Sequence, residues 1–330
     1  MKKTIFTILI IATMFFISGC YTNPNTYGTN FYSGSEGLVI DFYENAPPDT
    51  VFASSENNPG STNLESIIPV DVTIKNKGTY DLNGSNPGFL IMSYDEHYFE
   101  NIEQQQYLGP YMVDVPIILH GKSIYWPQGE EELRHIADLK VRPLQGQIAA
   151  PKTQILITSC YPYQTLFTKE VCMDMNIYSQ DVRPQACSSE IRELEDQGAP
   201  IAITRVEPVF LPSTQTNNSG FVKPRFNIHI ENVGEGVSWN YDDSVLVRDA
   251  CSLRATDKTT ENELTVNAWL STESLVCKPE PIRLIQNQVN VVCETRDPIR
   301  IQSNYMTTLR IEIDYLYTDS VSKTIQITRS

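Results

Sequence analysis

The chain has 330 residues, of which 41% are hydrophobic and 20% charged, with 25 Lys and Arg against 40 Asp and Glu. That length suits about two domains of roughly 100–200 residues, and the hydrophobic fraction excludes a wholly disordered chain. The net charge of −15 has no offsetting basic cluster and excludes a nucleic-acid partner, because a phosphate backbone would repel such a surface. Tyr (17) and Pro (20) are frequent, which is typical of strands and loops.

The N-terminus predicts export. A basic Met-Lys-Lys start precedes an apolar run at residues 4–17, which is too short for a permanent span of about 20 residues but right for a signal-peptide core. The run ends in Ile17-Ser-Gly-Cys20, which resembles the lipobox of bacterial-type lipoproteins, with Ile where Leu is more usual. The resemblance implies a signal peptide at 1–19 and lipidation of Cys20. The alternatives are an ordinary secretory signal or an anchor with an incidental Cys.

Cleavage would remove two lysines and change the net charge from −15 to −17. Residues 20–37 are mostly Asn, Thr, Ser, Gly and Tyr, so we expect a flexible tether there. The membrane is then a partner through the lipid anchor, because two acyl chains give stable anchoring. The expected location is the outer side of the cytoplasmic membrane or the cell surface.

Two pairs of segments indicate an internal repeat. Val70–Ile74 and Phe226–Ile230 both alternate apolar and polar residues, and each is followed by Asn-x-Gly. This pattern predicts a half-buried strand and a turn. The segments 155–163 and 309–317 also match, including two tyrosines in each. The offsets are 156 and 154 residues, so the two matches support one duplication.

The repeat predicts an all-β fold of two tandem β-sandwich domains, at 38–178 and 199–330, joined by a linker at 179–198. Each domain opens with a short apolar strand, at 37–42 and 199–203. Within the linker region, residues 188–196 could form a short helix. Further strands are expected at Gly88–Tyr94, Val113–Leu119, Val245–Asp249 and Val289–Cys293.

The run V-x-V-x-I-x-N-x-G occurs as PVDVTIKNKG and as RFNIHIENVG. It resembles the strand-and-turn signature of immunoglobulin-like, adhesion-related domains of the CARDB type. The segments CYPYQTLFTKEVC and QGAPIAITRVE are similar to uncharacterised secreted proteins of small-genome archaea. These resemblances imply a surface protein with immunoglobulin-like architecture and bring no known activity.

Six cysteines remain besides Cys20, and an even number in an exported chain indicates disulfides. Six allow 15 pairings. Local candidates are Cys160 with Cys172 and Cys277 with Cys293, which would leave Cys187 for Cys251. No zinc-type spacing is present, so a structural zinc site is not expected. The candidate disulfide residues are Cys160, Cys172, Cys187, Cys251, Cys277 and Cys293.

No motif predicts catalysis. The stretch Asp95-Glu96-His97 with Glu100 could bind a divalent cation, but four polar residues in six are more typical of an exposed loop. The HExxH motif is absent around His135, where a helix is in any case doubtful. Gly121–Ser123 lacks the other residues of a P-loop, and Asp81–Ser85 lacks the other residues of an EF-hand loop. We therefore expect no enzyme activity, no metal and no cofactor.

An aromatic cluster in the first domain is the candidate binding face, although packing in the core explains it more simply. Tyr161, Tyr163, Tyr315 and Tyr317 recur at equivalent positions and indicate a shared structural task. The predicted function is a non-catalytic surface lipoprotein for adhesion, scaffolding or envelope interaction, with a protein or glycan partner. The alternatives are a carbohydrate- or solute-binding module and, third, a β-sandwich hydrolase. The cluster consists of Tyr94, Tyr98, Phe99, Tyr107 and Tyr111.

Overall fold

The computed structural model describes residues 33–53, 66–102, 111–113, 115–144, 150–173, 197–212, 221–241, 246–254, 259–300 and 305–329. They belong to one compact unit, Phe31–Ser330. The predicted signal peptide, Cys20, most of the tether and the linker 179–198 with its helix lie outside the described residues, apart from Gln197 and Gly198. No helix in the described part is long and apolar enough to cross a membrane.

The fold is all-β, as predicted, with one short helix among the described residues. A smaller sheet has the order β1-β3-β7-β5, and a larger one has the order β16-β10-β15-β13-β12-β17-β8-β4-β6. The strands of the smaller sheet are β1 (Leu38–Phe42), β3 (Ile67–Asn76), β7 (Glu131–Val141) and β5 (Phe99–Asn101). The strands along the larger sheet are β16 (Ile299–Arg300), β10 (Phe221–Asn232), β15 (Gln288–Thr295), β13 (Glu273–Lys278), β12 (Glu263–Leu270), β17 (Tyr305–Arg329), β8 (Lys152–Met173), β4 (Phe89–Tyr94) and β6 (Tyr111–Met112). Four more strands pair with members of this sheet: β2 (Thr50–Ala53) and β11 (Val237–Trp239) with β17, β9 (Ile201–Pro212) with β10, and β14 (Ile282–Arg283) with β12.

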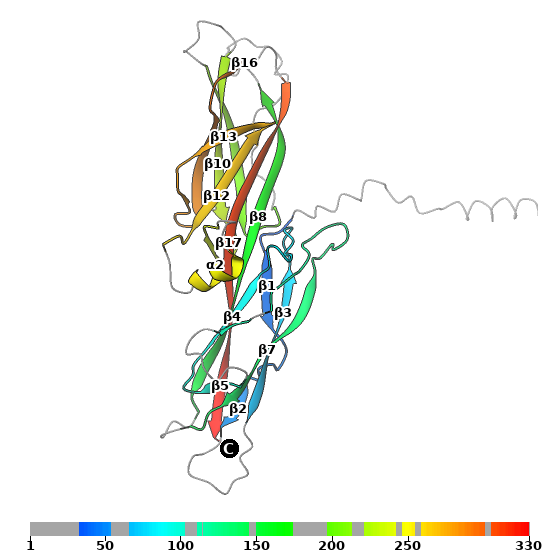
Figure 1. The fold of residues 1–330 in the computed structure, drawn as a ribbon, viewed down its shortest axis with the longest axis vertical. Coiled ribbons are helices and arrows are strands. Elements are labelled where there is room, and N and C mark those ends of the chain that lie inside the picture. Colours follow the sequence, from blue (N-terminus) through cyan, green and yellow to red (C-terminus); the bar gives the residue numbers. More distant parts are fainter. Residues whose placement is uncertain are drawn as a thin grey trace, which may run out of the picture. The chain divides into compact units, whose positions relative to one another are not determined.

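The two longest strands form an antiparallel ladder that joins the halves of the chain. β8 and β17 pair continuously from Met173 opposite Tyr305 to Lys152 opposite Gln326. In Figure 1 they run side by side as the green and red ribbons. β8 comes from the first repeat and β17 from the second, so the halves share one sheet.

The registers of the first strands repeat between the halves. β1 pairs with β3 so that Leu38 lies opposite Asn76, and β9 pairs with β10 so that Ile201 lies opposite Asn232. The two asparagines are 156 residues apart, which is the offset of the matched segments in the sequence. The sequence offset therefore relates residues with the same place in the sheet.

The ladder strands repeat in the same way. β4 pairs with β8 with Phe89 opposite Cys160, and β12 pairs with β17 with Thr265 opposite Asp314. Cys160 and Asp314 are 154 residues apart, the second offset of the sequence. Pro162 lies opposite Leu316, which is also its counterpart 154 residues later. An approximate two-fold axis therefore passes through this residue pair and relates the two halves.

Two of the expected strands are corrected by the structure. Val245–Asp249 overlaps helix α2 (Val247–Arg254), in which Val247, Ala250 and Cys251 are buried at helical spacing. A short apolar stretch fits either structure, and packing decides between them. Val113–Leu119 makes isolated bridges at Ile117 and Leu119 in place of a strand. Gly88–Tyr94 and Val289–Cys293 are confirmed as β4 and β15.

Strand β7 replaces the doubtful helix around His135. Its pairing with β3 shifts register between Val70 and Asp71, so that consecutive residues Ile136 and Ala137 are both buried. A bulge of this kind interrupts the alternation of apolar and polar residues. The period-2 signal that would have identified the strand is therefore broken in its middle.

The Asn-x-Gly turns are built alike in both halves. Asn76 Oδ1 accepts the Gly78 N–H and Asn232 Oδ1 accepts the Gly234 N–H, each at 3.2 Å. The side-chain amides donate to the carbonyls of Tyr80 and Gly236, each at 2.8 Å. Both asparagines are buried, so their side chains replace water for these backbone groups.

Asn76→Ala and Asn232→Ala should each lower the free energy of unfolding by about 1–3 kcal/mol, because each leaves buried backbone groups without a partner. Chemical denaturation measures the loss. Asn290→Ala, at an exposed strand position, is the control and should cost under about 0.5 kcal/mol. Equal effects of the three variants would contradict the structural role of the turn asparagines.

Candidate functional site

Four tyrosines, here called the tyrosine tetrad, meet at the centre of the β8–β17 ladder. Tyr161 lies opposite Tyr317 and Tyr163 lies opposite Tyr315. Neighbouring ring centroids are 5.8 to 6.1 Å apart, and no ring is more than 3% exposed. Alternate residues of a strand face the same side of the sheet, so the pairing places all four rings on one face.

Two members of the tetrad hold the first strand of each repeat. Tyr161 Oη accepts the Leu38 N–H at 3.0 Å, and Tyr315 Oη accepts the Ile201 N–H at 3.3 Å. These tyrosines are two-fold counterparts, as are the residues they bind. The shared structural task predicted from their recurrence is therefore to fasten the start of each repeat to the ladder.

The other two members hold the turns. Tyr163 Oη accepts the Thr79 N–H at 2.9 Å, and Tyr317 Oη accepts the Gly236 N–H at 2.8 Å. Burial raises the pKa of both phenols to about 12. It raises the pKa of Tyr161 and Tyr315 well above their ordinary value, so all four are neutral hydroxyls near neutral pH.

On one side of the axis the two repeats make a contact that we call the closed cleft. It joins the turn 77–80 of the first repeat to the segment 197–201 of the second, over Tyr163 and Tyr315. The Gly198 carbonyl accepts the Thr79 N–H at 3.0 Å and the O–H of Tyr163. Gly198 has φ of +64°, and a Cβ there would lie 2.5 Å from Thr79 Cγ2, so only glycine fits this contact without strain.

The two-fold counterpart of that contact is a cavity, which we call the open cleft. It lies between the turn 233–236 of the second repeat and the segment 35–38 of the first, over Tyr161 and Tyr317. Ser35 and Glu235 occupy the positions of Gly198 and Thr79, but no hydrogen bond between them is among the contacts of the described residues. The cavity has a volume of about 410 Å³.

One pair of counterparts, Thr165 and Asp319, differs in chemistry beside the tyrosines of the two clefts. In the closed cleft, Thr165 Oγ1 donates to the Ile201 carbonyl at 2.6 Å and lies 3.0 Å from Tyr315 Oη. In the open cleft, Asp319 stands 154 residues after Thr165. Burial raises the pKa of its carboxyl, although its hydrogen bond from the Ser320 N–H lowers it, and the nearby Glu235 raises it further.

The open cleft therefore offers acidic and phenolic oxygens. The described residues of its lining include neither His nor Cys, so they contain no pair of a nucleophile and an imidazole base. No group of three or more His, Cys, Asp or Glu residues within the described ranges is placed to hold a metal ion. The carboxylates that line the cavity are Glu36, Asp41, Glu235 and Asp319.

The predicted aromatic face is corrected at one position. Phe99 belongs to β5 of the smaller sheet and is fully buried in the main core, so it offers nothing to a ligand. Tyr94 and Tyr98 are half-buried and pack against the same core. Tyr107 lies outside the described residues, and Tyr111 belongs to β6 without a described side chain. A binding face formed by the four tyrosines of this cluster remains a prediction.

The disulfides confirm one expected pair and correct the other two. Cys277 is bonded to Cys293, its direct partner across β13 and β15. Cys160 is bonded to Cys251. It cannot reach Cys172, because both lie on β8 and twelve extended residues span about 40 Å. Cys251 is thus not available to Cys187, which lies outside the described residues.

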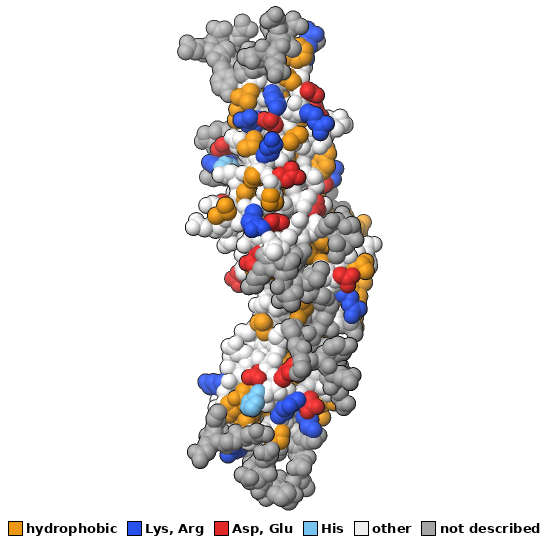
Figure 2. All heavy atoms as spheres, turned by 60° about the vertical axis from the view of Figure 1, so that its left-hand side comes forward, with side chains coloured by type: hydrophobic (Ala, Val, Ile, Leu, Met, Phe, Trp, Pro, Cys, Tyr) orange, Lys and Arg blue, Asp and Glu red, His pale blue; other side chains and the backbone are white. Residues whose placement is uncertain are grey.

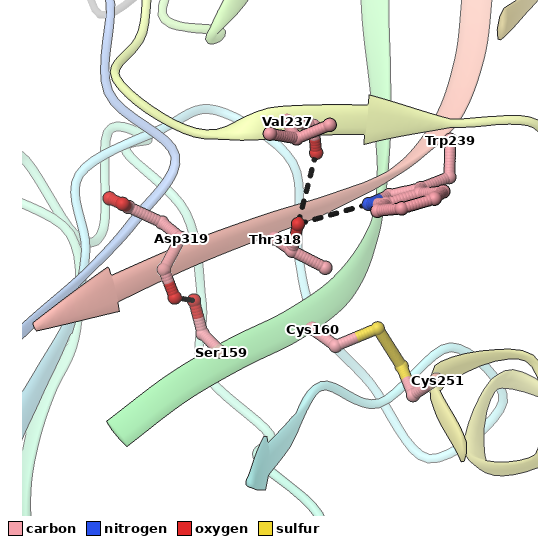
Figure 3. The surroundings of a disulfide bond; sticks show 7 residues. All are labelled: Ser159, Cys160, Val237, Trp239, Cys251, Thr318 and Asp319. Atoms are coloured by element: carbon pink, nitrogen blue, oxygen red, sulfur yellow. Dashed lines mark hydrogen bonds between the residues drawn. A yellow bond between two sulfur atoms is a disulfide. The ribbon is translucent and has the colours of Figure 1, made fainter. Parts of the chain in front are cut away.

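The Cys160–Cys251 bond fastens α2 to the ladder near its centre (Figure 3). Beside it, Trp239 Nε1 donates to Thr318 Oγ1 at 3.0 Å, and Thr318 Oγ1 donates to the Val237 carbonyl at 3.3 Å. Cys172 is also disulfide-bonded. Disulfides persist in oxidising compartments, so these bonds indicate an extracytoplasmic protein.

The open cleft was missed in the sequence because its residues are scattered over both halves. The sequence does contain one signal of the open cleft. When the two repeats are aligned, Asp319 stands at the position of Thr165, so an acidic residue replaces a hydroxyl beside the recurring tyrosines. Protein-family models give no match to the chain, and no curated protein matches it. The candidate site therefore rests on its own geometry.

Alkaline titration should show the tetrad as a separate class of tyrosines. Because the folded-state pKa of Tyr163 and Tyr317 is about 12 and the ordinary value is near 10, their stabilising contribution is complete below about pH 10 and is lost as the pH rises towards 12. Ultraviolet absorbance of tyrosinate should show these residues ionising after the exposed ones, together with unfolding. Tyrosines that all ionise near pH 10 in the folded protein would contradict the burial.

Proposed function

We propose that the protein is an exported lipoprotein, anchored through Cys20, whose two immunoglobulin-like repeats form a non-catalytic module for adhesion, scaffolding or envelope interaction. The lipobox, the disulfides and the resemblance to CARDB-type domains support this role. So do the matching strand registers of the two halves, which suit a duplicated domain. The surface location follows from the anchor and the signal peptide.

One observation carries the interaction role: an ordered loop presents three consecutive apolar residues to solvent. Ile124, Tyr125 and Trp126 are 67%, 83% and 40% exposed. The loop is held by hydrogen bonds between Ser123 and Trp126, in which each backbone N–H is a donor. His120 stacks on the Trp126 ring at a centroid distance of 5.6 Å. Exposed apolar patches with Tyr and Trp are typical of protein interfaces.

On the face shown in Figure 2, acidic, basic and hydrophobic side chains are interspersed. Such a face has no extended basic patch for a phosphate backbone, in keeping with the negative net charge. We therefore propose a protein partner for the loop 124–126.

Lipid anchoring predicts that Cys20→Ala releases the protein from the membrane fraction, because the acyl chains are attached to that thiol. Fractionation of the native cells measures this. Ser18→Ala keeps a small residue at its lipobox position and should leave the protein anchored. Tight membrane association of the Cys20→Ala variant would refute anchoring through this residue.

Photo-crosslinking tests the contact loop. A photoreactive phenylalanine analogue in place of Tyr125 should yield a protein adduct on intact cells, because the side chain would lie in the interface. The same analogue at Ile285, a 72% exposed apolar position in the second repeat, is the control and should yield no such adduct. Adducts at 285 and none at 125 would overturn the assignment of the loop.

A further inference from the structure

The hydroxyl of Tyr161 is the unusual member of the tetrad. It is 1% exposed, lines the open cleft and accepts the Leu38 N–H. Its own O–H has no acceptor among the described residues, whereas the other three hydroxyls each have one. A buried O–H donor without an acceptor is costly, so an acceptor from outside the chain would be favoured there. The acceptors of the others are Gly198 O for Tyr163, Asn232 Oδ1 for Tyr317 and Thr165 Oγ1 for Tyr315.

The assignment for Tyr315 follows from proton counting. Thr165 Oγ1 gives its only proton to the Ile201 carbonyl at 2.6 Å. It can therefore only accept at its 3.0 Å contact with Tyr315, which must be the donor. In the second repeat Asp319 takes the place of Thr165, and no hydrogen bond between its carboxylate and Tyr161 is among the contacts of the described residues.

The charges around the cavity point to the sign of what it would bind. In the described part of the chain, four carboxylates line the cavity and no Lys, Arg or His does. Glu36 is paired with Lys77 at 3.3 Å, outside the lining. Asp319 is half-buried and faces the negative field of Glu235. A cation in the cavity would relieve that repulsion.

We propose that the open cleft binds a small organic ammonium compound that also carries a hydroxyl or carbonyl oxygen. Its ammonium would donate to Asp319 and Glu235, and its oxygen would accept the O–H of Tyr161. A volume of about 410 Å³ lies within the range of small-molecule sites. This proposal does not depend on lipid anchoring or on the loop 124–126. Ligand binding in the open cleft and the proposed surface function can therefore be refuted independently of each other.

The closed cleft shows that the tetrad accommodates such an oxygen. There the Gly198 carbonyl accepts the O–H of Tyr163 and the N–H of Thr79. The protein itself thus fills one of the two related clefts with an amide oxygen. In the open cleft Tyr317, the counterpart of Tyr163, already donates to Asn232 Oδ1. The oxygen of the ligand would therefore accept from Tyr161, with its ammonium placed against the carboxylates that the closed cleft lacks.

The test is calorimetric titration of the Cys20→Ala mature chain with glucosamine at about pH 6, below ordinary amine pKa values. Glucose lacks the ammonium and cyclohexylamine lacks the oxygens, so each should bind at least about tenfold more weakly. Absence of glucosamine binding would overturn the proposal. Equal binding of either control compound would also overturn it.

Variants locate the binding in the cleft. Asp319→Asn and Tyr161→Phe should each weaken glucosamine binding about tenfold or more. Tyr315→Phe makes the same change in the closed cleft and should leave the affinity unchanged. Wild-type affinity in both Asp319→Asn and Tyr161→Phe would refute the site.

Asp319→Thr separates binding from folding, because Tyr161→Phe also removes the bond to the Leu38 N–H. It recreates the arrangement of Thr165, whose hydroxyl gives the neighbouring tyrosine an acceptor. We expect it to raise the melting temperature and to abolish glucosamine binding. Retention of binding by a folded Asp319→Thr variant would overturn the proposal.

Discussion

The antiparallel ladder of β8 and β17 is the interaction on which the rest of the molecule depends. It places Pro162 opposite its own counterpart Leu316, and this pairing generates the approximate two-fold relation of the halves. It also brings four tyrosines onto one face and buries them. Buried hydroxyls need partners, and the backbone groups at the start of each repeat and in each turn supply them. The hydroxyls of Tyr161 and Tyr315 therefore hold the first strand of each repeat, at Leu38 and Ile201, against the centre of the ladder.

Much of this architecture could be predicted because its signals are local. The alternation in Val70–Ile74 and Phe226–Ile230, the Asn-x-Gly turns and the offsets of 156 and 154 residues all correspond to real strands and registers. Strand partners are not a local property. Nothing in residues 155–163 says that they pair with 309–317, since a period-2 pattern states which face is buried and not what lies alongside. The joining of the two halves in one sheet therefore appears only in the structure.

The disulfides illustrate the same limit. Cys277 and Cys293 are close in sequence because they lie on neighbouring strands, so proximity identified the pair. Cys160 and Cys172 are closer still, yet β8 is one unbroken strand and keeps them apart. Proximity in sequence predicts a bridge only where the chain turns between the two residues. Between 160 and 172 the chain has no Gly, Asn or Asp, and Pro162 is its single turn-forming residue, so a turn that would bring the two cysteines together had little support in the sequence.

The candidate site arises where the two-fold relation fails, and the reason lies in the position of glycine. In the second repeat, Gly198 adopts φ of +64° and turns its carbonyl onto Thr79 and Tyr163. Its counterpart in the first repeat is Ser35, for which a positive φ would be costly. The residue with a positive φ in the first repeat is therefore Gly34, one position earlier. The Gly34 carbonyl is thereby bonded to the Gly198 N–H, on the closed side. With its left-handed glycine one position earlier, the first repeat is bonded to the closed side through the Gly34 carbonyl, and the described contacts include no hydrogen bond from Ser35 to Glu235 across the open cleft. The wall of that cleft holds Asp319 and the O–H of Tyr161, which has no acceptor among the described residues.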